Sequence, residues 1–411
     1  MRSPVRQARI GMAAIALALA ATGCGSTSTA GTSSGSGGAG TAGGSSTSVA
    51  DGSNDAAATS STSGASGSGQ ASVSAEALAQ IEKNLEPYTG HPNAFPVTEK
   101  LTKRPPKGST FAFLQCSTPI CALIGLMNQQ AAGALGVPLS VTKSAASAQA
   151  LQDAMSSIIA TKPSAVLIPA ADPVQYKEPM SQLKQLGIPV VSQGVVDTAQ
   201  FPAIKGSILG VPAATIAGTL LADWVVKRNG VSPSVFYTVP ELSFSPFIVA
   251  GFKKEMASVC PTCQTRFVEI SAAKIGNTAP SVVTSGLQAN PGTKTAIFGS
   301  EEAADGLPAA QKVADIKVDT VGFAPDPAVL GYIKNGSITA GLGYDIRTTS
   351  WVQVDMAARL VTGQPLTDAE QHDPSVMQML EQKDITFDPT KGFNGYPDVA
   401  ERFAALWPAA S

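Results

Sequence analysis

Residues 295–361 read TAIFGSEEAADGLPAAQKVADIKVDTVGFAPDPAVLGYIKNGSITAGLGYDIRTTSWVQVDMAARLV, and this stretch decides the fold. It contains three short apolar runs, at 295–299, 318–323 and 338–344, and a helical pattern follows each run. Short apolar runs that alternate with helical patterns of roughly 10–15 residues are typical of βα units on a parallel sheet. We therefore predict a parallel α/β arrangement here.

Polar or aromatic residues follow each predicted strand of this stretch. Glu301 comes after the first strand and Asp326 after the second, and the third strand ends at Tyr344-Asp345. In open α/β sheets, ligands bind outside the carboxyl ends of the strands. We expect these residues to form half of a ligand cleft, beside a crossing between two lobes.

The same alternation fills the chain before this stretch. It forms two consecutive blocks, and the second block restarts with the apolar run at 235–239. Two such blocks predict an α/β fold of two Rossmann-like lobes with parallel sheets. The predicted strands of the first block are 110–114, 137–141, 165–168, 187–191 and 204–209.

The composition narrows the range of functions. Charged residues make up 14% of the 411 residues, the formal net charge is −2, and no block of Lys and Arg stands out. We therefore expect no nucleic-acid partner, because proteins that bind nucleic acids carry basic patches. The two histidines, His91 and His372, make a histidine-rich metal site or a catalytic triad a poor expectation. We expect no metal, no cofactor and no catalytic residue.

The first 24 residues have the features of a bacterial export signal. Three arginines precede an apolar segment, residues 10–21, which is too short to span a membrane. The signal ends at Leu19-Ala-Ala-Thr-Gly-Cys24, which resembles a lipobox, although Ala21 stands where leucine is commonest. We predict that Cys24 carries a lipid anchor on the outer face of the cell membrane. The alternative is an ordinary signal peptide with a chance cysteine.

Two segments separate this signal from the first predicted lobe. Residues 25–73 are almost entirely Gly, Ser, Thr and Ala, so they cannot form a core and are predicted to be a disordered tether. Residues 74–108 predict a short helix, capped by Ser74, and then a proline-rich lead-in. We expect this second segment to pack on the outside of the first lobe.

A C-terminal extension, residues 364–411, follows the repeating pattern. Phe403, Leu406 and Trp407 are spaced three and four residues apart in the way that one face of a short helix requires. We expect this helix to dock on the lobes.

Four cysteines follow Cys24, namely Cys116, Cys121, Cys260 and Cys263. In an exported chain an even number suggests disulfides, with three possible connectivities. We favour the two local pairs. Cys260-Pro-Thr-Cys263 also has the spacing of a thioredoxin-like redox motif, but it follows a predicted helix instead of beginning one. A zinc site of four cysteines is a further alternative.

Several short motifs carry a resemblance to a known family. Ala165-Val-Leu-Ile-Pro-Ala170 and Leu186-Gly-Ile-Pro-Val-Val191 resemble the first lobe of the type I periplasmic-binding proteins, in the ribose-binding-like branch. Val321-Gly-Phe323 and Ile333-Lys-Asn-Gly-Ser-Ile338 resemble the second lobe. The resemblance covers residues 109–363 and depends on the order and spacing of these motifs.

The resemblance implies two α/β lobes that are joined by three crossings and close around a solute. It places the crossings near Leu209, near residues 342–344 and after Gly363. The implied boundaries are 109–210 with 345–363 for the first lobe and 211–344 for the second lobe.

Most sugar-binding residues of the family have no counterpart in this chain. Two Asp positions fall at Gly194 and Ala324, and an Arg position falls at Ile248. An Asn-Asp pair becomes Ser300-Glu301, so one carboxylate remains. Sugars need dense hydrogen bonding, because each buried hydroxyl requires a partner. We therefore expect an apolar or ring-bearing ligand instead of a simple hexose or pentose.

The positions that match the family, together with the strand ends, give a predicted ligand-binding set. For Phe244 and Phe247, a place in a helix core is the alternative. Arg347 either pairs with Asp345 on the surface or reaches a ligand carboxylate. The predicted ligand-binding residues are Ser117, Pro119, Ile120, Gln193, Phe244, Phe247, Glu301, Asp326, Tyr344 and Asp345.

These features favour a solute-binding protein outside the cytoplasm, a monomer that delivers a small molecule to the permease of an ABC importer. A sensing module that signals to a membrane receptor is the alternative, and the gene neighbourhood would separate the two. A hydrolase or redox enzyme of similar fold is disfavoured, because the sequence pairs no nucleophile with a nearby histidine and has no metal-ligand cluster or phosphate loop.

Overall fold

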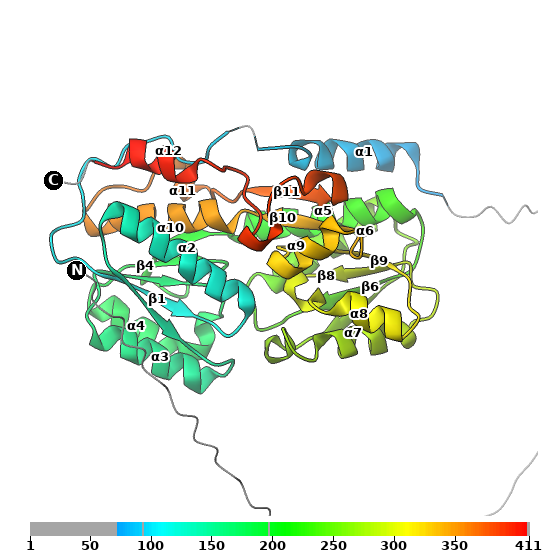
Figure 1. Ribbon diagram of the computed structural model, residues 1–411, viewed down its shortest axis with the longest axis horizontal. Coiled ribbons are helices and arrows are strands. Elements are labelled where there is room, and N and C mark those ends of the chain that lie inside the picture. Colours follow the sequence, from blue (N-terminus) through cyan, green and yellow to red (C-terminus); the bar gives the residue numbers. More distant parts are fainter. Residues whose placement is uncertain (1–71, 93, 196–197, 409–411) are drawn as a thin grey trace, which may run out of the picture. The chain divides into compact units, whose positions relative to one another are not determined.

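Two parallel sheets with helices packed on both faces form the body of the chain (Figure 1). The computed structural model describes residues 72–92, 94–195 and 198–408. The two sheets confirm the predicted α/β fold of two Rossmann-like lobes. The predicted signal, Cys24 and residues 25–71 of the predicted tether lie outside the described residues. Within the described part, no helix has the length and apolar character needed to cross a membrane.

The first lobe contains a sheet of five parallel strands in the order β2-β1-β3-β4-β5. Its side chains alternate between two cores: Phe111 and Phe113 enter one, and Ala112 and Leu114 enter the other. The strands are β1 (Phe111–Gln115), β2 (Leu139–Lys143), β3 (Ala165–Ile168), β4 (Val190–Gln193) and β5 (Ile204–Ile208).

Helices cover both faces of this first sheet. Helices α2 and α10 contact each other on one face, and α3 and α4 lie on the other (Figure 1). A left-handed Gly136 ends α2, as is common at helix C-termini. The helices are α2 (Pro119–Leu135), α3 (Ala148–Ala160), α4 (Lys177–Gln185), α10 (Ile346–Val361) and the short α11 (Asp368–Gln371).

The second lobe contains a parallel sheet in the order β7-β6-β8-β9. An antiparallel pair of strands, β10 and β11, adjoins it through a bridge between Phe323 and Leu342. The strands are β6 (Ser234–Thr238), β7 (Thr265–Glu269), β8 (Thr295–Phe298), β9 (Asp319–Gly322), β10 (Ala340–Tyr344) and β11 (Met377–Glu381). The helices are α5 (Val211–Asn229), α6 (Ser245–Val259), α7 (Ala279–Gln288), α8 (Leu307–Val313) and α9 (Pro327–Lys334).

Two glycines allow α5 and α6 to lie in backbone contact. A Cβ atom on Gly218 of α5 would lie 2.0 Å from the carbonyl oxygen of Ile248. A Cβ atom on Gly251 of α6 would lie 2.1 Å from the carbonyl oxygen of Thr215. Any side chain at either position would force the two helices apart, so this close contact requires glycine.

The chain crosses between the lobes three times, as the resemblance implies. It passes from β5 to α5 at Leu209-Gly210, from β10 to α10 at Tyr344-Asp345, and from α11 to β11 over residues 372–376. The carboxylate of Asp373 in the third crossing accepts hydrogen bonds from the Leu209 and Gly210 backbone N–H groups of the first, at 3.0 and 2.5 Å. Leu209 and Asp373 both have positive φ, a conformation that costs energy in non-glycine residues.

Helix α1 (Ala75–Leu85) packs against α5 and α6 of the second lobe (Figure 1). The expectation that this helix packs on the first lobe is therefore wrong. It buries Ile81 and Leu85, and Asn84 donates a hydrogen bond to Asp223 of α5. The chain then continues to the first lobe, where the Leu101 N–H donates to the carbonyl of Leu406. The lead-in thus connects both lobes.

The C-terminal extension also connects the lobes. Strand β11 pairs with β10, and the final helix, α12 (Val399–Leu406), packs against α10 and α2. Trp407 stacks on Trp351 of α10 at a centroid distance of 5.5 Å, and its indole N–H donates to the buried Asp355. Asp355 also pairs with Arg359, which contacts Glu370 of α11. This buried network fixes the extension on the first lobe.

The four cysteines form two local disulfides, Cys116–Cys121 and Cys260–Cys263. The favoured pairing is therefore confirmed. The first disulfide joins the loop after β1 to the first turn of α2, and the second closes the turn at the end of α6.

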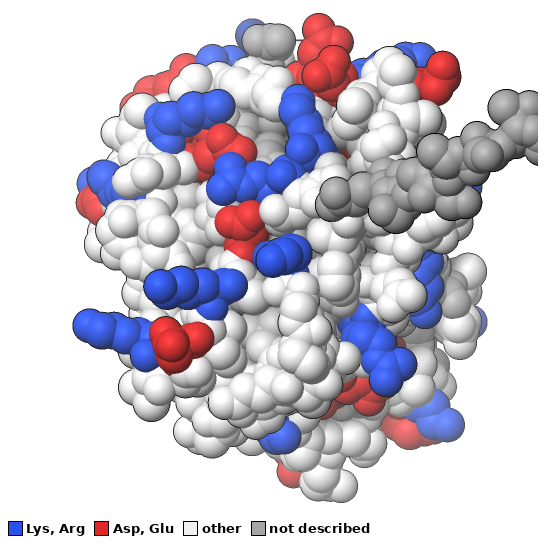
Figure 2. Space-filling model, turned by 90° about the vertical axis from the view of Figure 1, so that its right-hand side faces the viewer, with Lys and Arg blue, Asp and Glu red and all other residues white. Residues whose placement is uncertain are grey.

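Charged side chains of both signs are interspersed over the second-lobe end of the molecule, the face shown in Figure 2. Two ion pairs join the second lobe's α5 to its neighbours: Lys227 contacts Glu82 of α1, and Arg228 contacts Asp319 of β9. Both pairs are partly exposed, so each contributes little to stability.

Candidate functional site

A small cavity of about 40 Å³ lies between the lobes, at the carboxyl ends of the strands. Both lobes and two of the crossings contribute to its walls, as expected for a ligand site in sheets of this type. The described residues that line it are Thr118, Ile120, Cys121, Ile124, Pro169, Ala170, Gln193, Gly194, Leu209, Leu242, Phe244, Ser300, Glu302, Phe323, Ala324, Tyr344 and Ile346.

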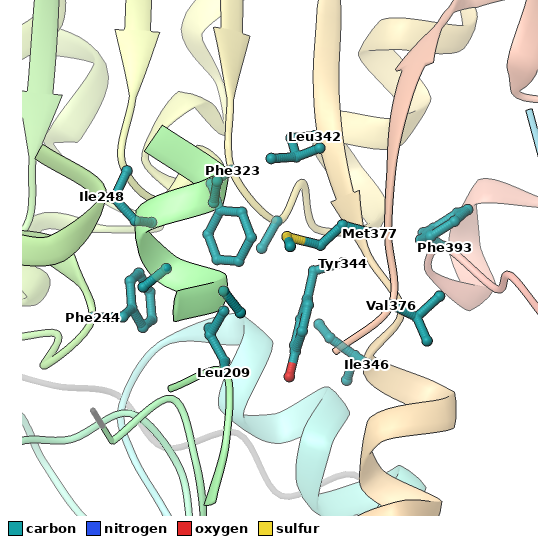
Figure 3. Close-up of a cluster of buried hydrophobic side chains, with 14 of the residues drawn as sticks. Leu209, Phe244, Ile248, Phe323, Leu342, Tyr344, Ile346, Val376, Met377 and Phe393 are labelled. Carbon is teal, nitrogen blue, oxygen red and sulfur yellow. The ribbon is translucent and has the colours of Figure 1, made fainter. Parts of the chain in front are cut away.

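Three aromatic rings form one wall of the cavity. The ring centroids of Phe244 and Phe323 are 5.6 Å apart, and those of Phe323 and Tyr344 are 5.7 Å apart. Figure 3 shows these rings beside Leu209, which belongs to the first crossing, and Ile346, which begins α10 directly after the second crossing. Phe323 directly follows β9, so its strand-end position was the signal in the sequence that could have identified it.

The lobes are closed around this cavity. Ser243 of the second lobe donates two hydrogen bonds to first-lobe carbonyls: its N–H to Ala170 at 3.1 Å and its hydroxyl to Gly194 at 2.6 Å. Ala171 and Leu242 also form an isolated antiparallel bridge across the gap. These contacts join the lobes through the Ser243 hydroxyl and several backbone groups at the edge of the cavity.

Glu302 spans the two lobes from a short 3-10 helix, η4 (Glu301–Ala304). Its Oε2 accepts a hydrogen bond of 3.3 Å from the N–H of Ile120, in the first turn of α2, and its Oε1 accepts one of 3.4 Å from Ser300. The carboxylate therefore caps a helix of the opposite lobe, where the helix dipole favours negative charge. Glu302 is 1% exposed.

The environment of Glu302 acts on its ionisation in opposite directions. Burial, assisted by the nearby Asp326 carboxylate, raises the pKa of Glu302 to about 7. The Ile120 N–H and the Thr118 and Ser300 hydroxyls act against this increase, because they stabilise the ionised form. The closed lobes thus hold a carboxyl group that changes its charge near neutral pH.

Gln193 ends β4 and is the second polar side chain of the cavity that can accept a further hydrogen bond. Its amide nitrogen donates to Thr349 at 2.9 Å and to the Tyr344 hydroxyl at 3.5 Å. Its Oε1 is buried and accepts no hydrogen bond from the described residues. Gln193 therefore offers an acceptor and no free donor.

The structure brings together four of the ten predicted ligand-binding residues: Ile120, Gln193, Phe244 and Tyr344 all line the cavity. Ser117 lies in an adjoining hollow with Glu241 of the second lobe. The remaining five predicted residues, Pro119, Phe247, Glu301, Asp326 and Asp345, are not among the described residues that line the cavity. Arg347 is not among them either.

Glu301 points into the second lobe, away from the cavity. Its side chain lies against Gly322 of β9 and Gly341 of β10, where a Cβ atom on Gly341 would lie 2.4 Å from Oε2. Neither carboxylate oxygen has a hydrogen-bond partner of normal geometry among the described residues, although the Gly322 N–H is near. Burial and the Asp326 carboxylate raise the pKa of Glu301 well above its usual range.

Asp326 and Asp345 are helix caps. Asp326 accepts a hydrogen bond from the Val329 N–H at the start of α9, at 2.9 Å. Asp345 accepts one of 2.9 Å from the Thr348 N–H at the start of α10, and another of 2.8 Å from the N–H of Gly395 in the C-terminal extension. N-cap Asp residues satisfy N–H groups that have no partner within the helix, which explains both positions without a ligand.

A family of known proteins matches residues 121–365, and its description is "Periplasmic binding protein domain". The chain belongs to the periplasmic-binding-protein family. The match covers more than half of the chain and includes most of both lobes and the first two of the three crossings. No curated protein matches the sequence.

Solved structures share the fold of this binding protein at low sequence identity. A carbohydrate transporter solute-binding protein from Agrobacterium radiobacter, in complex with D-arabinose, has a TM-score of 0.58 at 16% identity and covers 70% of this chain and 99% of its own. A 5-methylthioribose transporter solute-binding protein from Thermotoga lettingae, with 5-methylthioribose, has a TM-score of 0.61 at 15% identity and covers 74% and 99%. A putative LacI transcriptional regulator from Bacteroides fragilis has a TM-score of 0.60 at 12% identity and covers 68% and 99%.

Glu302 should make the stability of the protein depend on pH. Because the pKa of the buried carboxyl is raised to about 7 from its ordinary value of 4.5, the folded state binds the proton more tightly than the unfolded chain. This contribution is fully present at low pH and is lost as the pH rises through about 7. The melting temperature should therefore fall between about pH 5 and about pH 8, and Glu302→Gln should reduce that fall by ~2–4 °C for each kcal/mol involved.

Calorimetric melting of both proteins across this range measures the effect. Other buried carboxyls titrate in the same range, including Glu370, so the difference between wild type and variant is the relevant quantity. The exposed Glu178→Gln on α4 is the matched control and should leave the pH profile unchanged. Parallel profiles for wild type and Glu302→Gln would contradict the assignment.

Proposed function

We propose that this chain is a lipid-anchored solute-binding protein, exposed outside the cytoplasm, that delivers a small molecule to the permease of an ABC importer. The observation that carries the proposal is the cavity enclosed between two lobes, each of which supplies about half of its lining. A site of this kind exists only when the lobes meet, so solute capture and lobe closure are one event. The polar groups of the cavity serve binding, and we propose no catalytic role for them.

The proposed mechanism is a hinge that a solute biases. A solute that contacts both lobes stabilises the closed form by the difference between its affinities for the closed and open forms. The crossings at Leu209 and Tyr344 line the cavity themselves, so the same residues contact the solute and take part in the change of lobe angle. The permease would recognise the outer faces of the two lobes in the arrangement that they have in the closed form. The binding protein would act as a monomer.

The lining of the cavity supports a solute other than a simple hexose or pentose. Apolar and aromatic side chains supply most of the wall, and Glu302 is the one charged side chain among the described lining residues. A buried sugar hydroxyl without a partner costs about 1–3 kcal/mol. The related structures with D-arabinose and 5-methylthioribose establish that the fold holds small molecules, and their low identity to this chain leaves the ligand open.

A ligand-sensing module that signals to a membrane receptor is the second candidate. The likeness to a putative transcriptional regulator supports it, because the same fold then serves regulation as well as transport. Permease and ATPase genes beside this gene would favour transport, and a kinase gene would favour sensing.

Solute binding should discriminate against sugars. Ribose, glucose and galactose should not bind at low-micromolar affinity, whereas a thermal-shift screen of apolar and ring-bearing solutes should find at least one that raises the melting temperature. Binding of a ligand at 100 times its Kd stabilises a protein by ≈ 2.7 kcal/mol, which such a screen resolves. Calorimetry that finds low-micromolar binding of one of the three sugars would contradict the proposed ligand class.

The N-terminal sequence supports anchoring of this binding protein to the outer face of the membrane. Cys24 ends a lipobox-like signal, and the Gly/Ser/Thr/Ala-rich tether that follows would separate the lobes from the lipid. Cys24→Ala should therefore release the protein from the membrane fraction, as measured by fractionation and immunoblotting. An unmodified residue at the mature N-terminus of purified wild-type membrane protein would refute the anchor.

A further inference from the structure

The open polar capacity of the cavity consists of hydrogen-bond acceptors. The Oε1 of Gln193 has no donor among the described residues. The oxygens of Glu302 accept long hydrogen bonds of 3.3 Å from Ile120 and 3.4 Å from Ser300, and the Thr118 hydroxyl also interacts with this carboxyl group. Two backbone N–H groups at the cavity are engaged: that of Gly194 donates to Ile208 at 2.7 Å, and that of Ala324 donates to Leu342 at 2.9 Å. A solute with hydrogen-bond donors can bind to these free acceptors, whereas a solute with acceptors alone cannot.

The charge of the cavity leads to the same conclusion. Among the described residues that line it there is a carboxylate, Glu302, and there is no Lys, Arg or His. A solute carboxylate or phosphate would enter without a cation to pair with and beside a like charge, which is costly in a buried site. A solute cation would instead meet the one group that needs a counter-charge.

The aromatic wall favours a cation with an apolar body. Phe244, Phe323 and Tyr344 present a continuous set of rings, and rings attract cations through their faces as well as burying apolar surface. The cavity volume of about 40 Å³ accommodates a single ammonium group, so a larger body requires a slightly wider separation of the lobes. Such a solute combines a small charged end with an apolar end.

We propose that the solute of this protein is an apolar amine in its protonated form, whose ammonium group binds the Glu302 carboxylate, with the Gln193 Oε1 as a second acceptor and the aromatic wall around the apolar body. This inference rests on the proposed function, because it identifies the chemical class of the solute for the same cavity. The pairing of the solute ammonium with Glu302 explains why a carboxylate is buried between the lobes. The solute supplies the positive charge that the described lining residues do not supply.

The test uses three probes of the same ring and different charge: benzylammonium, benzyl alcohol and benzoate. Calorimetry at about pH 8, where Glu302 is largely ionised, should show benzylammonium binding at least tenfold more tightly than either other probe. Glu302→Gln should weaken benzylammonium binding at least tenfold and should lower the ratio of benzylammonium affinity to benzyl alcohol affinity by at least the same factor. The exposed Glu178→Gln is the matched control and should bind all three probes as wild type does.

Three outcomes overturn the inference: benzoate binding as tightly as benzylammonium, no benzylammonium binding at millimolar concentration, or unchanged benzylammonium affinity in a folded Glu302→Gln protein. The preference of the wild-type protein among the probes decides the question even if the variant does not fold. Failure of the inference remains distinct from failure of the proposed function. A neutral or anionic solute found in the thermal-shift screen refutes only the amine, whereas a protein that no solute of any charge stabilises refutes solute binding.

Discussion

The closed form of this protein depends on one costly interaction, the burial of the Glu302 carboxylate between two lobes. Removing a carboxylate from water is unfavourable unless hydrogen bonds and opposite charge replace the lost hydration. The Ile120 N–H, the Ser300 and Thr118 hydroxyls and the positive end of α2 replace part of it, and the hydrogen bonds from Ile120 and Ser300 are long. When the lobes separate, water can solvate the group fully. Closure is therefore finely balanced, which is the condition in which a solute can shift the equilibrium.

Residues of the lead-in and of the C-terminal extension hold the crossings of the hinge in place. Asp373 ties the first crossing to the third through the N–H groups of Leu209 and Gly210, and Asp345 ties the second crossing to Gly395. The two terminal segments also contact each other, since the ring of Phe95 packs against Tyr396 at a centroid distance of 5.1 Å. The lead-in and the C-terminal extension thus add two connections between lobes that already share three, and they narrow the paths along which the lobes can move.

The repeating pattern of the sequence predicted the two lobes, because strand-helix alternation acts over a few residues. The family resemblance implied the three crossings, and the even number of cysteines in an exported chain favoured the two local disulfides. The sequence did not distinguish Glu301 from Glu302. The choice depends on how η4 turns after β8, which places one carboxylate inside the second lobe and the next between the lobes. The position of α1 depends on contacts with α5, about 140 residues away along the chain, such as Asn84 with Asp223. The sequence around Ser74 contains no local signal for that partner.

The most direct test of the role of Glu302 is the distance between the lobes as a function of pH. Spin labels at Glu178→Cys on α4 and Lys312→Cys on α8, both exposed, report this distance by pulsed electron paramagnetic resonance. Since the pKa of Glu302 is raised in the closed form, protonation favours closure. The short distance should dominate at about pH 5, longer distances should appear at about pH 8, and Glu302→Gln should abolish the change. A single distance that is independent of pH would contradict the account.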